Sequence, residues 1–275
     1  MKTLLPAWLV GEFFGTFLLV FFGCGSVAAA VLLGAQVGIF QVAIVWGLGI
    51  ATAIYLTGAL SGAHLNPAVT CALATCGDFP ARRVAGYVAA QFAGALAAAA
   101  VLHAVFAGPL AGYEAAHGIV RGAAGSEATA MIFGEFFPNP GGKPLTEAAR
   151  TMVSPGAAFF IEVLGTAVLV LVIFCATDVK NSGRPAKESA PVMIGLTVTL
   201  LISLLAPLTQ AGFNPARDLG SRVWSAVFGG WGAVPFAANG WGWLTVYVFA
   251  PLVGGQVGGI LYRLFFKPGY VEESK

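Results

Sequence analysis

Charged side chains are scarce in this chain. Its 275 residues include only 14 lysines and arginines and 12 aspartates and glutamates, which together make 9% of the sequence. Ordinary soluble domains carry roughly 25% charged residues. Because 58% of the residues are apolar and the net charge is only +2, the composition argues against a soluble enzyme and against a nucleic-acid-binding protein. We expect an integral membrane protein.

The sequence has few cysteines, and it shows neither a cluster with metal-ligand spacing nor the pattern of a cleavable signal. The four cysteines stand in apolar stretches without the spacing of metal ligands, so we interpret them as small buried residues. No nucleophile–base pair is evident, and the sequence therefore predicts no enzyme, no metal and no cofactor. The apolar run from Trp8 to Leu33 is too long for a signal peptide, so this first segment is expected to remain as a membrane span.

Long apolar segments are what the sequence has in abundance. Six of them, at about 8–33, 38–60, 84–106, 153–177, 190–208 and 242–266, reach the roughly 20 residues that a helix needs to cross a bilayer. Two shorter segments, about 67–77 and 215–228, each open with Asn-Pro-Ala. At about 1.5 Å per residue, a helix of that length crosses only part of the membrane. The predicted fold class is an all-α membrane protein with six transmembrane helices plus two re-entrant half-helices, in one domain over residues 1–275.

The chain is also an internal repeat. Glu12-Phe-Phe-Gly-Thr16 in the first span matches Glu162-Val-Leu-Gly-Thr166 in the fourth, and the two Asn-Pro-Ala triplets follow these glutamates by 54 and 52 residues. The copies cover about 8–106 and 153–266, joined by a loop at about 107–152. Because each copy holds three full spans, the second must be inverted relative to the first. The two half-helices are then expected to enter from opposite faces and meet near the midplane.

Basic residues predict the orientation of the chain in the membrane. Nine of the fourteen lysines and arginines fall on one side, together with both termini. Cytoplasmic loops carry an excess of Lys and Arg. We therefore expect a multi-pass protein of the cell membrane with both termini in the cytoplasm and the 107–152 loop outside, as a cap or a vestibule.

Asn-Pro at the head of an apolar helix has a direct physical meaning. Asparagine is among the best N-cap residues, and proline is well tolerated at the first helical position. The N-terminus of each half-helix carries roughly half a positive charge. Two such ends at one point suit neutral polar solutes or anions and repel cations.

At this level of detail the sequence resembles a known family, the major intrinsic proteins (aquaporins and glycerol facilitators). The resemblance rests on Ser61-Gly-Ala-His-Leu-Asn-Pro-Ala-Val-Thr70 and on Gly212-Phe-Asn-Pro-Ala-Arg-Asp218. The Pro207-Leu-Thr209 run, Asp218 and the Phe137-Pro-Asn-Pro140 run are similar to the glycerol-facilitator branch. The family implies passive conduction and a homotetramer in the lipid bilayer, with one pore per subunit.

The resemblance also implies roles for individual residues. The pore centre would be formed by Asn66, Pro67, Ala68, Asn214, Pro215 and Ala216. A ladder of carbonyl acceptors would come from Gly62, Ala63, His64, Leu65, Gln210 and Gly212. Each asparagine would use its side-chain oxygen for the cap and leave its amide hydrogens free for the pore.

Three acidic residues call for an explanation at membrane depth or beside it. Glu12 and Glu162 are costly in lipid and need partners. The family role is to accept backbone N–H groups of the re-entrant loops, and the alternative is proton transport in a coupled carrier. Asp218 is expected to anchor its loop rather than to contact solute.

The selectivity filter is where the sequence departs from the glycerol-facilitator pattern. Trp46 and Arg217 match it, but Ile202 stands where glycine is usual and Ala211 stands where a second aromatic residue is usual. The derived filter of Trp46, Ile202, Ala211 and Arg217 is similar to that of the plant nodulin-26-like branch. Phe213 lies near but out of register, and in an alternative arrangement the loop shifts so that Phe213 fills the gap.

The predicted function is a passive channel for glycerol, other small uncharged solutes and water that excludes ions and protons. One alternative is a channel mainly for water, or mainly for urea or metalloid hydroxides. Another, from a different class, is an ion-coupled secondary transporter, since inverted repeats and broken helices also occur in carriers. The only candidates for its ion site are Glu12 and Glu162.

Overall fold

The structure is a computed structural model that describes residues 5–36 and 38–270, and over these residues it contains helices and loops but no strand. Five membrane-length helices are α1 (Ala7–Leu33), α2 (Ile39–Ser61), α4 (Val84–Val105), α8 (Pro155–Thr177) and α9 (Ala190–Thr209). A sixth span, Gly242–Gly269, is built from α12 (Gly242–Leu244), a π-helical turn, α13 (Ala250–Leu261) and two short terminal turns. Six helices within the described residues are thus long and apolar enough to cross a membrane, as the sequence predicted.

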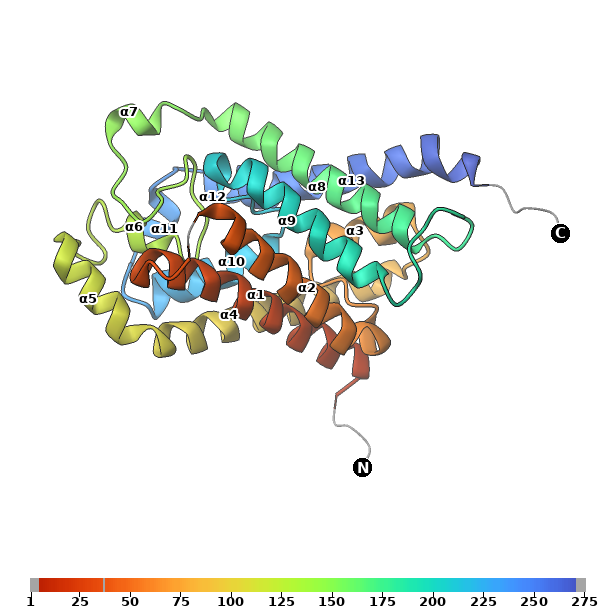
Figure 1. Cartoon of the computed structure of the whole chain (residues 1–275), viewed down its shortest axis with the longest axis horizontal. Helices are drawn as coiled ribbons and strands as arrows, with labels where there is room; N and C mark the ends of the chain where they lie inside the picture. Colours follow the sequence, from red (N-terminus) through yellow and green to blue (C-terminus); the bar gives the residue numbers. More distant parts are fainter. Residues whose placement is uncertain (1–4, 37, 271–275) are drawn as a thin grey trace.

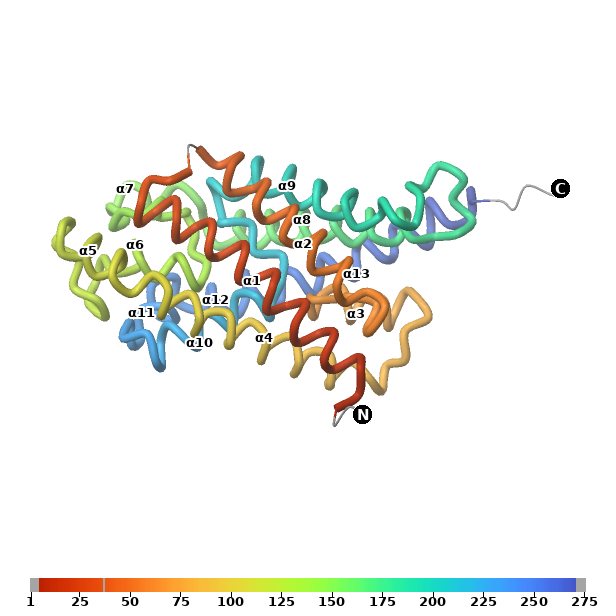
Figure 2. Tube along the Cα trace, turned by 60° about the horizontal axis from the view of Figure 1, so that its bottom comes forward, coloured from red at the N-terminus to blue at the C-terminus, as the bar shows by residue number. Residues whose placement is uncertain are grey.

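Two short helices occupy the positions predicted for the half-helices. They are α3 (Pro67–Cys76) and α10 (Pro215–Val227), and in each the preceding asparagine is the N-cap and the proline is the first helical residue. Figures 1 and 2 place α3 toward the end of the molecule that holds the α8–α9 connection, and α10 toward the opposite end. The half-helices therefore lie on opposite sides of the middle of the bundle.

The long connection after α4 contains helices that the sequence did not indicate. They are α5 (Ala107–His117), α6 (Glu127–Ala130) and α7 (Glu147–Arg150), and α11 (Val234–Ala237) follows later in the chain. Both views show α5, α6 and α11 gathered at one end of the bundle (Figures 1 and 2). The expectation about the two termini falls on residues 1–4 and 271–275, which lie outside the described residues.

Glycines allow the spans to cross at close range. A Cβ on Gly47 in α2 would lie 2.5 Å from the carbonyl oxygen of Gly195 in α9, and a Cβ on Gly195 would lie 2.2 Å from that of Gly47. These glycines are 148 residues apart, as are Asn66 and Asn214. The crossing of α2 and α9 thus joins corresponding points of the two halves, and only glycine fits there.

Candidate functional site

Two cavities enter the molecule and meet at three residues. The larger, about 780 Å³, is lined by residues from the α8–α9 connection, such as Glu188, through to Asn66 and Asn214. The smaller, about 270 Å³, is lined by Gln36 and Asn139 among others. Both cavities share three lining residues: Trp46, Ile202 and Arg217. These side chains therefore stand at the junction of a path that runs through the molecule.

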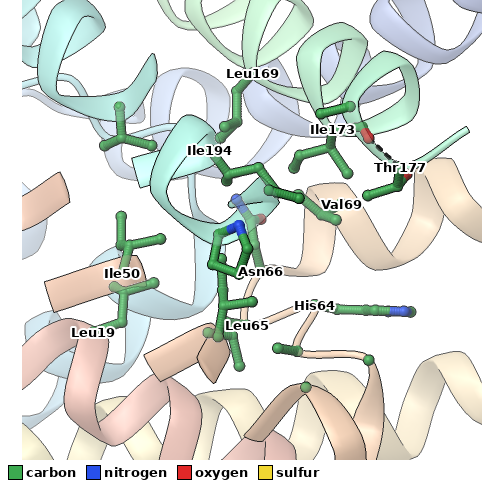
Figure 3. A pocket seen from close by; sticks show the side chains of 18 of the residues that line it. Leu19, Ile50, His64, Leu65, Asn66, Val69, Leu169, Ile173, Thr177 and Ile194 are labelled. Atoms are coloured by element: carbon green, nitrogen blue, oxygen red, sulfur yellow. Dashed lines mark hydrogen bonds between the residues drawn. The ribbon is translucent and has the colours of Figure 1, made fainter. Parts of the chain in front are cut away.

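The wall of the larger cavity is mostly apolar around a polar centre. Figure 3 shows Asn66 and Leu65 in the middle, with Val69 and Ile194 nearby and Ile50 to one side. The ring of His64 points away from this centre (Figure 3), and it packs against Phe79 at a centroid distance of 4.5 Å. Only the backbone of His64 is thus placed to face the centre.

A buried glutamate holds the loop that precedes α3. Glu12 in α1 is fully buried, and its carboxylate accepts the N–H of His64 at 2.9 Å and that of Leu65 at 2.8 Å. Gln91 in α4 donates to the same carboxylate at 2.6 Å. Ala63 and Leu65 have positive φ angles of 50° and 54°, which costs about 1–2 kcal/mol for each non-glycine residue. The glutamate offsets this strain and leaves the loop carbonyls for other partners.

The loop that precedes α10 is held in the same way. Glu162 in α8 accepts the N–H of Gly212 at 3.0 Å and that of Phe213 at 2.7 Å, and the Thr209 hydroxyl donates to it at 2.6 Å. Gln210, Ala211 and Phe213 also have positive φ angles. Each glutamate thus accepts two backbone N–H groups from a strained loop and at least one side-chain donor.

The two asparagines bridge the halves, which corrects one prediction from the sequence. The side-chain oxygen of each caps its own helix, as expected. However, Asn66 Nδ2 donates to the carbonyl of Phe213 at 2.8 Å, and Asn214 Nδ2 donates to the carbonyl of Leu65 at 2.8 Å. An amide carries two hydrogens. One hydrogen of each asparagine is therefore used between the loops and only the other remains for a solute, while the Leu65 carbonyl is already an acceptor.

Phe213 lies behind its loop. A Cβ on Gly165 in α8 would lie 2.1 Å from Cε1 of the Phe213 ring, so the ring occupies the space that this glycine leaves. In the first half, a Cβ on Gly15 would lie 2.3 Å from Cδ2 of Leu65. The packing against Gly165 does not support the alternative in which Phe213 fills the gap beside Ala211.

Arg217 stands at the junction with three partners. Its guanidinium carbon lies 4.9 Å from the ring centroid of Trp46, within the range of a cation–π contact. Its Nη1 donates to the carbonyl of Phe133 at 3.3 Å, and its Nε lies 3.1 Å from a carboxylate oxygen of Glu135. Arg217 and Glu135 are 2% and 1% exposed, so most of the surface of both side chains is covered by protein.

The long connection after α4 contributes to this site, which the sequence did not predict. Glu135 is a single acidic residue in the otherwise uncharged run Met131–Phe137, and that isolation was the one available signal. The sequence predicted that Gln210 contributes its carbonyl to the pore. Its side chain accepts the N–H of Phe136 at 2.8 Å and donates to the carbonyl of Met131 at 3.1 Å. The loop is therefore fastened directly to the site.

Asp218 also fastens the loop. Its carboxylate accepts the N–H of Glu135 at 2.7 Å and is paired with Arg222, whose nitrogens lie 2.6 Å and 2.8 Å from it. Arg222 donates in turn to the carbonyls of Pro235 and Glu135. Asp218 is 0% exposed and is not among the residues that line the two cavities, so its bonds lie within the protein.

Comparison with known proteins agrees with this arrangement. The sequence profile described as "Major intrinsic protein" matches residues 4–262. The chain is 40% identical to a glycerol uptake facilitator protein of Pseudomonas aeruginosa, over 93% of this chain and 87% of that protein. It is 37% identical to the propanediol uptake facilitator PduF of Citrobacter freundii, over 96% and 93% of the two chains.

A solved structure is similar as well. The aquaglyceroporin from Plasmodium falciparum superposes with a TM-score of 0.80 at 26% identity, covering 96% of this chain and 98% of that one. The profile match and the relatives cover nearly the whole chain, including both half-helices and the junction of the two cavities. The chain belongs to the major intrinsic protein family.

Proposed function

We propose that this protein is a passive channel of the cell membrane for glycerol, other small uncharged solutes and water, and that it excludes ions and protons. The observation that carries the proposal is the path formed by two cavities that meet at Trp46, Ile202 and Arg217. The relatives named for uptake of glycerol and of propanediol support this choice of solutes. A diol or triol has the size and the hydrogen-bonding groups that such a path accommodates.

Conduction then depends on replacing the hydrogen bonds that a solute makes in water. Arg217 donors, the one remaining amide hydrogen of Asn66 and that of Asn214 supply the donors, and loop carbonyls supply the acceptors. The opposite wall carries branched apolar side chains such as Ile50 and Ile194, which suit the C–H face of a polyol. No step requires chemistry or an energy source.

The narrow selectivity filter is proposed to consist of Trp46, Ile202, Ala211 and Arg217. All four line the larger cavity, and the small side chain of Ala211 leaves space that an aromatic residue would fill. Phe213 is assigned to packing against Gly165 rather than to the filter. We expect this filter to admit solutes at least as wide as glycerol.

Exclusion of cations is proposed to arise from fixed positive charge on the path. The N-terminal ends of α3 and α10 meet through their asparagines, and each end carries roughly half a positive charge. Arg217 presents its guanidinium at the filter, beside the carboxylate of Glu135. Cations, including hydronium, are therefore repelled, whereas neutral solutes are not.

The buried glutamates favour a channel over an ion-coupled carrier. A coupled carrier needs an ion or proton site, and the sequence offered Glu12 and Glu162 for that role. Each accepts two backbone N–H groups and at least one side-chain donor. We assign both glutamates to holding the re-entrant loops.

The assembly and orientation follow from the family and from the distribution of charge. We propose a homotetramer with one pore per subunit, a single channel domain with both termini in the cytoplasm, and an external position for residues 107–152. Large apolar side chains on the outer surface, such as Phe14, Leu48 and Phe160, are suited to contact lipid or a neighbouring subunit.

Stopped-flow light scattering on proteoliposomes tests the function. We expect rapid glycerol entry with a low activation energy and no dependence on an ion gradient. Fast water flux without glycerol entry would replace the proposal with a water channel, and preference for urea or boric acid would change the solute. Uptake that requires a sodium or proton gradient would overturn the passive mechanism.

A further inference from the structure

A carboxylate from outside the repeats is in contact with the filter arginine. Glu135 belongs to the external connection, yet its side chain is 1% exposed and its Oε1 lies 3.1 Å from Nε of Arg217. Its backbone is fixed on both sides, because its N–H donates to Asp218 and its carbonyl accepts from Arg222. Both of these partners lie on α10, the helix that carries Arg217. Glu135 and Arg217 are thus held in one rigid frame.

The other charges near the filter are already matched. Asp218 is paired with Arg222 through two hydrogen bonds. Glu162 accepts its three donors from the loop before α10. This leaves Glu135 as the counter-ion of Arg217.

Gly212 makes room for this carboxylate. A Cβ at position 212 would lie 2.2 Å from Oε2 of Glu135 and 3.1 Å from Oε2 of Glu162. Oε2 of Glu135 and Nε of Arg217 are both buried and have no hydrogen-bond partner among the residues that the structure describes, so the 3.1 Å approach of the two side chains is an ion contact rather than a hydrogen bond. A buried carboxylate with a free oxygen is costly unless a charge compensates it, and Arg217 is the compensating charge.

We propose that Glu135 is a positioning residue of the filter, which fixes the guanidinium of Arg217 and offsets its charge, so that the pair sets which ions are excluded. This inference rests on the filter assigned under the proposed function. It adds a fifth residue, supplied by the external connection, to the four that were derived from the sequence.

Removing one member of the pair is expected to change ion selectivity in the opposite direction from removing the other. Without Arg217, a buried negative charge remains beside the path and attracts cations. Without the carboxylate, the positive charge of Arg217 is uncompensated and attracts anions. Without both, the filter is neutral. At a few ångströms in a medium less polar than water, one unpaired charge changes ion entry by about tenfold or more.

The test uses Arg217→Ala, Glu135→Gln and the double variant in proteoliposomes with a KCl gradient across the membrane. A potential-sensitive dye reports the sign of the leak, a pH-sensitive dye reports protons, and glycerol entry is recorded in the same vesicles. Arg217→Met replaces Arg217→Ala if the alanine variant does not assemble. Glu127→Gln is the matched control, because Glu127 lies in the same connection and is paired with an arginine, Arg150 at 2.6 Å, and neither residue is among those that line the two cavities.

We expect Arg217→Ala to leak cations and protons about tenfold or more above wild type, and Glu135→Gln to produce a potential of the opposite sign. The double variant is expected to return toward the wild-type leak, and Glu127→Gln to match wild type. The proposal is overturned if the double variant leaks cations as much as Arg217→Ala, if both single variants leak with the same sign, or if Glu135→Gln stays ion-tight. Glycerol entry in wild-type vesicles separately reports whether the proposed function holds.

Discussion

Two parts of the larger cavity are lined by corresponding positions of the two halves and carry different side chains. Residues 148 apart in the sequence pair across the halves: Trp46 with Ile194, Ile54 with Ile202, Ala63 with Ala211, and Val69 with Arg217. All eight line the larger cavity. At the proposed filter the set is Trp46, Ile202, Ala211 and Arg217, and the corresponding set is Ile54, Ala63, Val69 and Ile194.

The difference shows that the repeat supplies geometry and that a few residues supply selectivity. At these positions one set has an arginine and an indole ring, with a buried glutamate beside the arginine, whereas the corresponding set has four apolar side chains. The connection after α4 contacts Arg217 and Gln210 through Phe133, Glu135 and Phe136. Discrimination among solutes is therefore expected to be concentrated at one end of the path.

The hydrogen bonds that hold the two re-entrant loops are similar in the two halves but come partly from different residues. Tyr87 donates to the Ser61 carbonyl at 2.8 Å, and Tyr247 donates to the Thr209 carbonyl at 3.1 Å. Gln91, four residues after Tyr87, donates to Glu12, but Pro251 stands four residues after Tyr247 and has no side-chain donor. The Thr209 hydroxyl supplies the third bond to Glu162 instead.

The largest expected effect comes from removing either glutamate. Glu162→Leu and Glu12→Leu should each leave three donors unmatched in a buried site, at a cost of about 3 kcal/mol or more. We expect both variants to lose most of their folded protein, measured by size-exclusion yield and thermal unfolding in detergent. Normal stability of one variant alone would mean that the two supports are not equivalent.

The next effect comes from the glycines behind the loops. Gly165→Ala places a methyl group against the rigid ring of Phe213, and Gly15→Ala places one against the flexible side chain of Leu65. We expect Gly165→Ala to destabilise the protein by about 1–3 kcal/mol and Gly15→Ala by less. Thermal unfolding in detergent measures the difference, and the reverse order would contradict this account of the packing.

Arg217 and Val69 provide a direct comparison of the two ends. Arg217→Ala is expected to lower the permeability ratio of glycerol to a five-carbon polyol by about tenfold, because it removes the donor that discriminates between solutes. Val69→Ala should leave that ratio nearly unchanged. Stopped-flow swelling with both solutes measures it, and equal changes in the two variants would place the selective step elsewhere.

The smallest expected effect comes from narrowing the proposed filter. Ala211→Phe should reduce the permeability of bulky polyols severalfold more than that of water, whereas Ala63→Phe should not show this preference. The alanines have similar φ angles, 60° and 50°, so the backbone strain of the two substitutions is matched. Equal losses for water and polyols in Ala211→Phe would remove Ala211 from the filter.

Several of these features could be predicted from the sequence for physical reasons. The apolar runs had to be spans, and Asn66 and Asn214 had to be caps because proline follows each of them. The matching glutamates could be recognised by their spacing from these caps. Ile202 and Ala211 could be located only by the resemblance to the family.

Other features could not be predicted, because they depend on contacts between distant segments. The bond between Asn66 and Phe213 joins residues 147 apart, and no periodicity marks it. Glu135 reaches the filter through a loop whose path is determined by Gln210 and Asp218. The helix over Ala107–His117 was missed because glycine and proline at its start suggested an irregular loop.

The reciprocal bonds of the two asparagines have a consequence for biosynthesis. A chain is made from its N-terminus, so the first half exists in the membrane before the second has been synthesised. Until then, the amide of Asn66 lacks the Phe213 carbonyl and the carbonyl of Leu65 lacks the Asn214 amide. The centre of the path is therefore completed only when the last half-helix arrives. A protein interrupted before residue 214 lacks both of these bonds and therefore the finished pore centre.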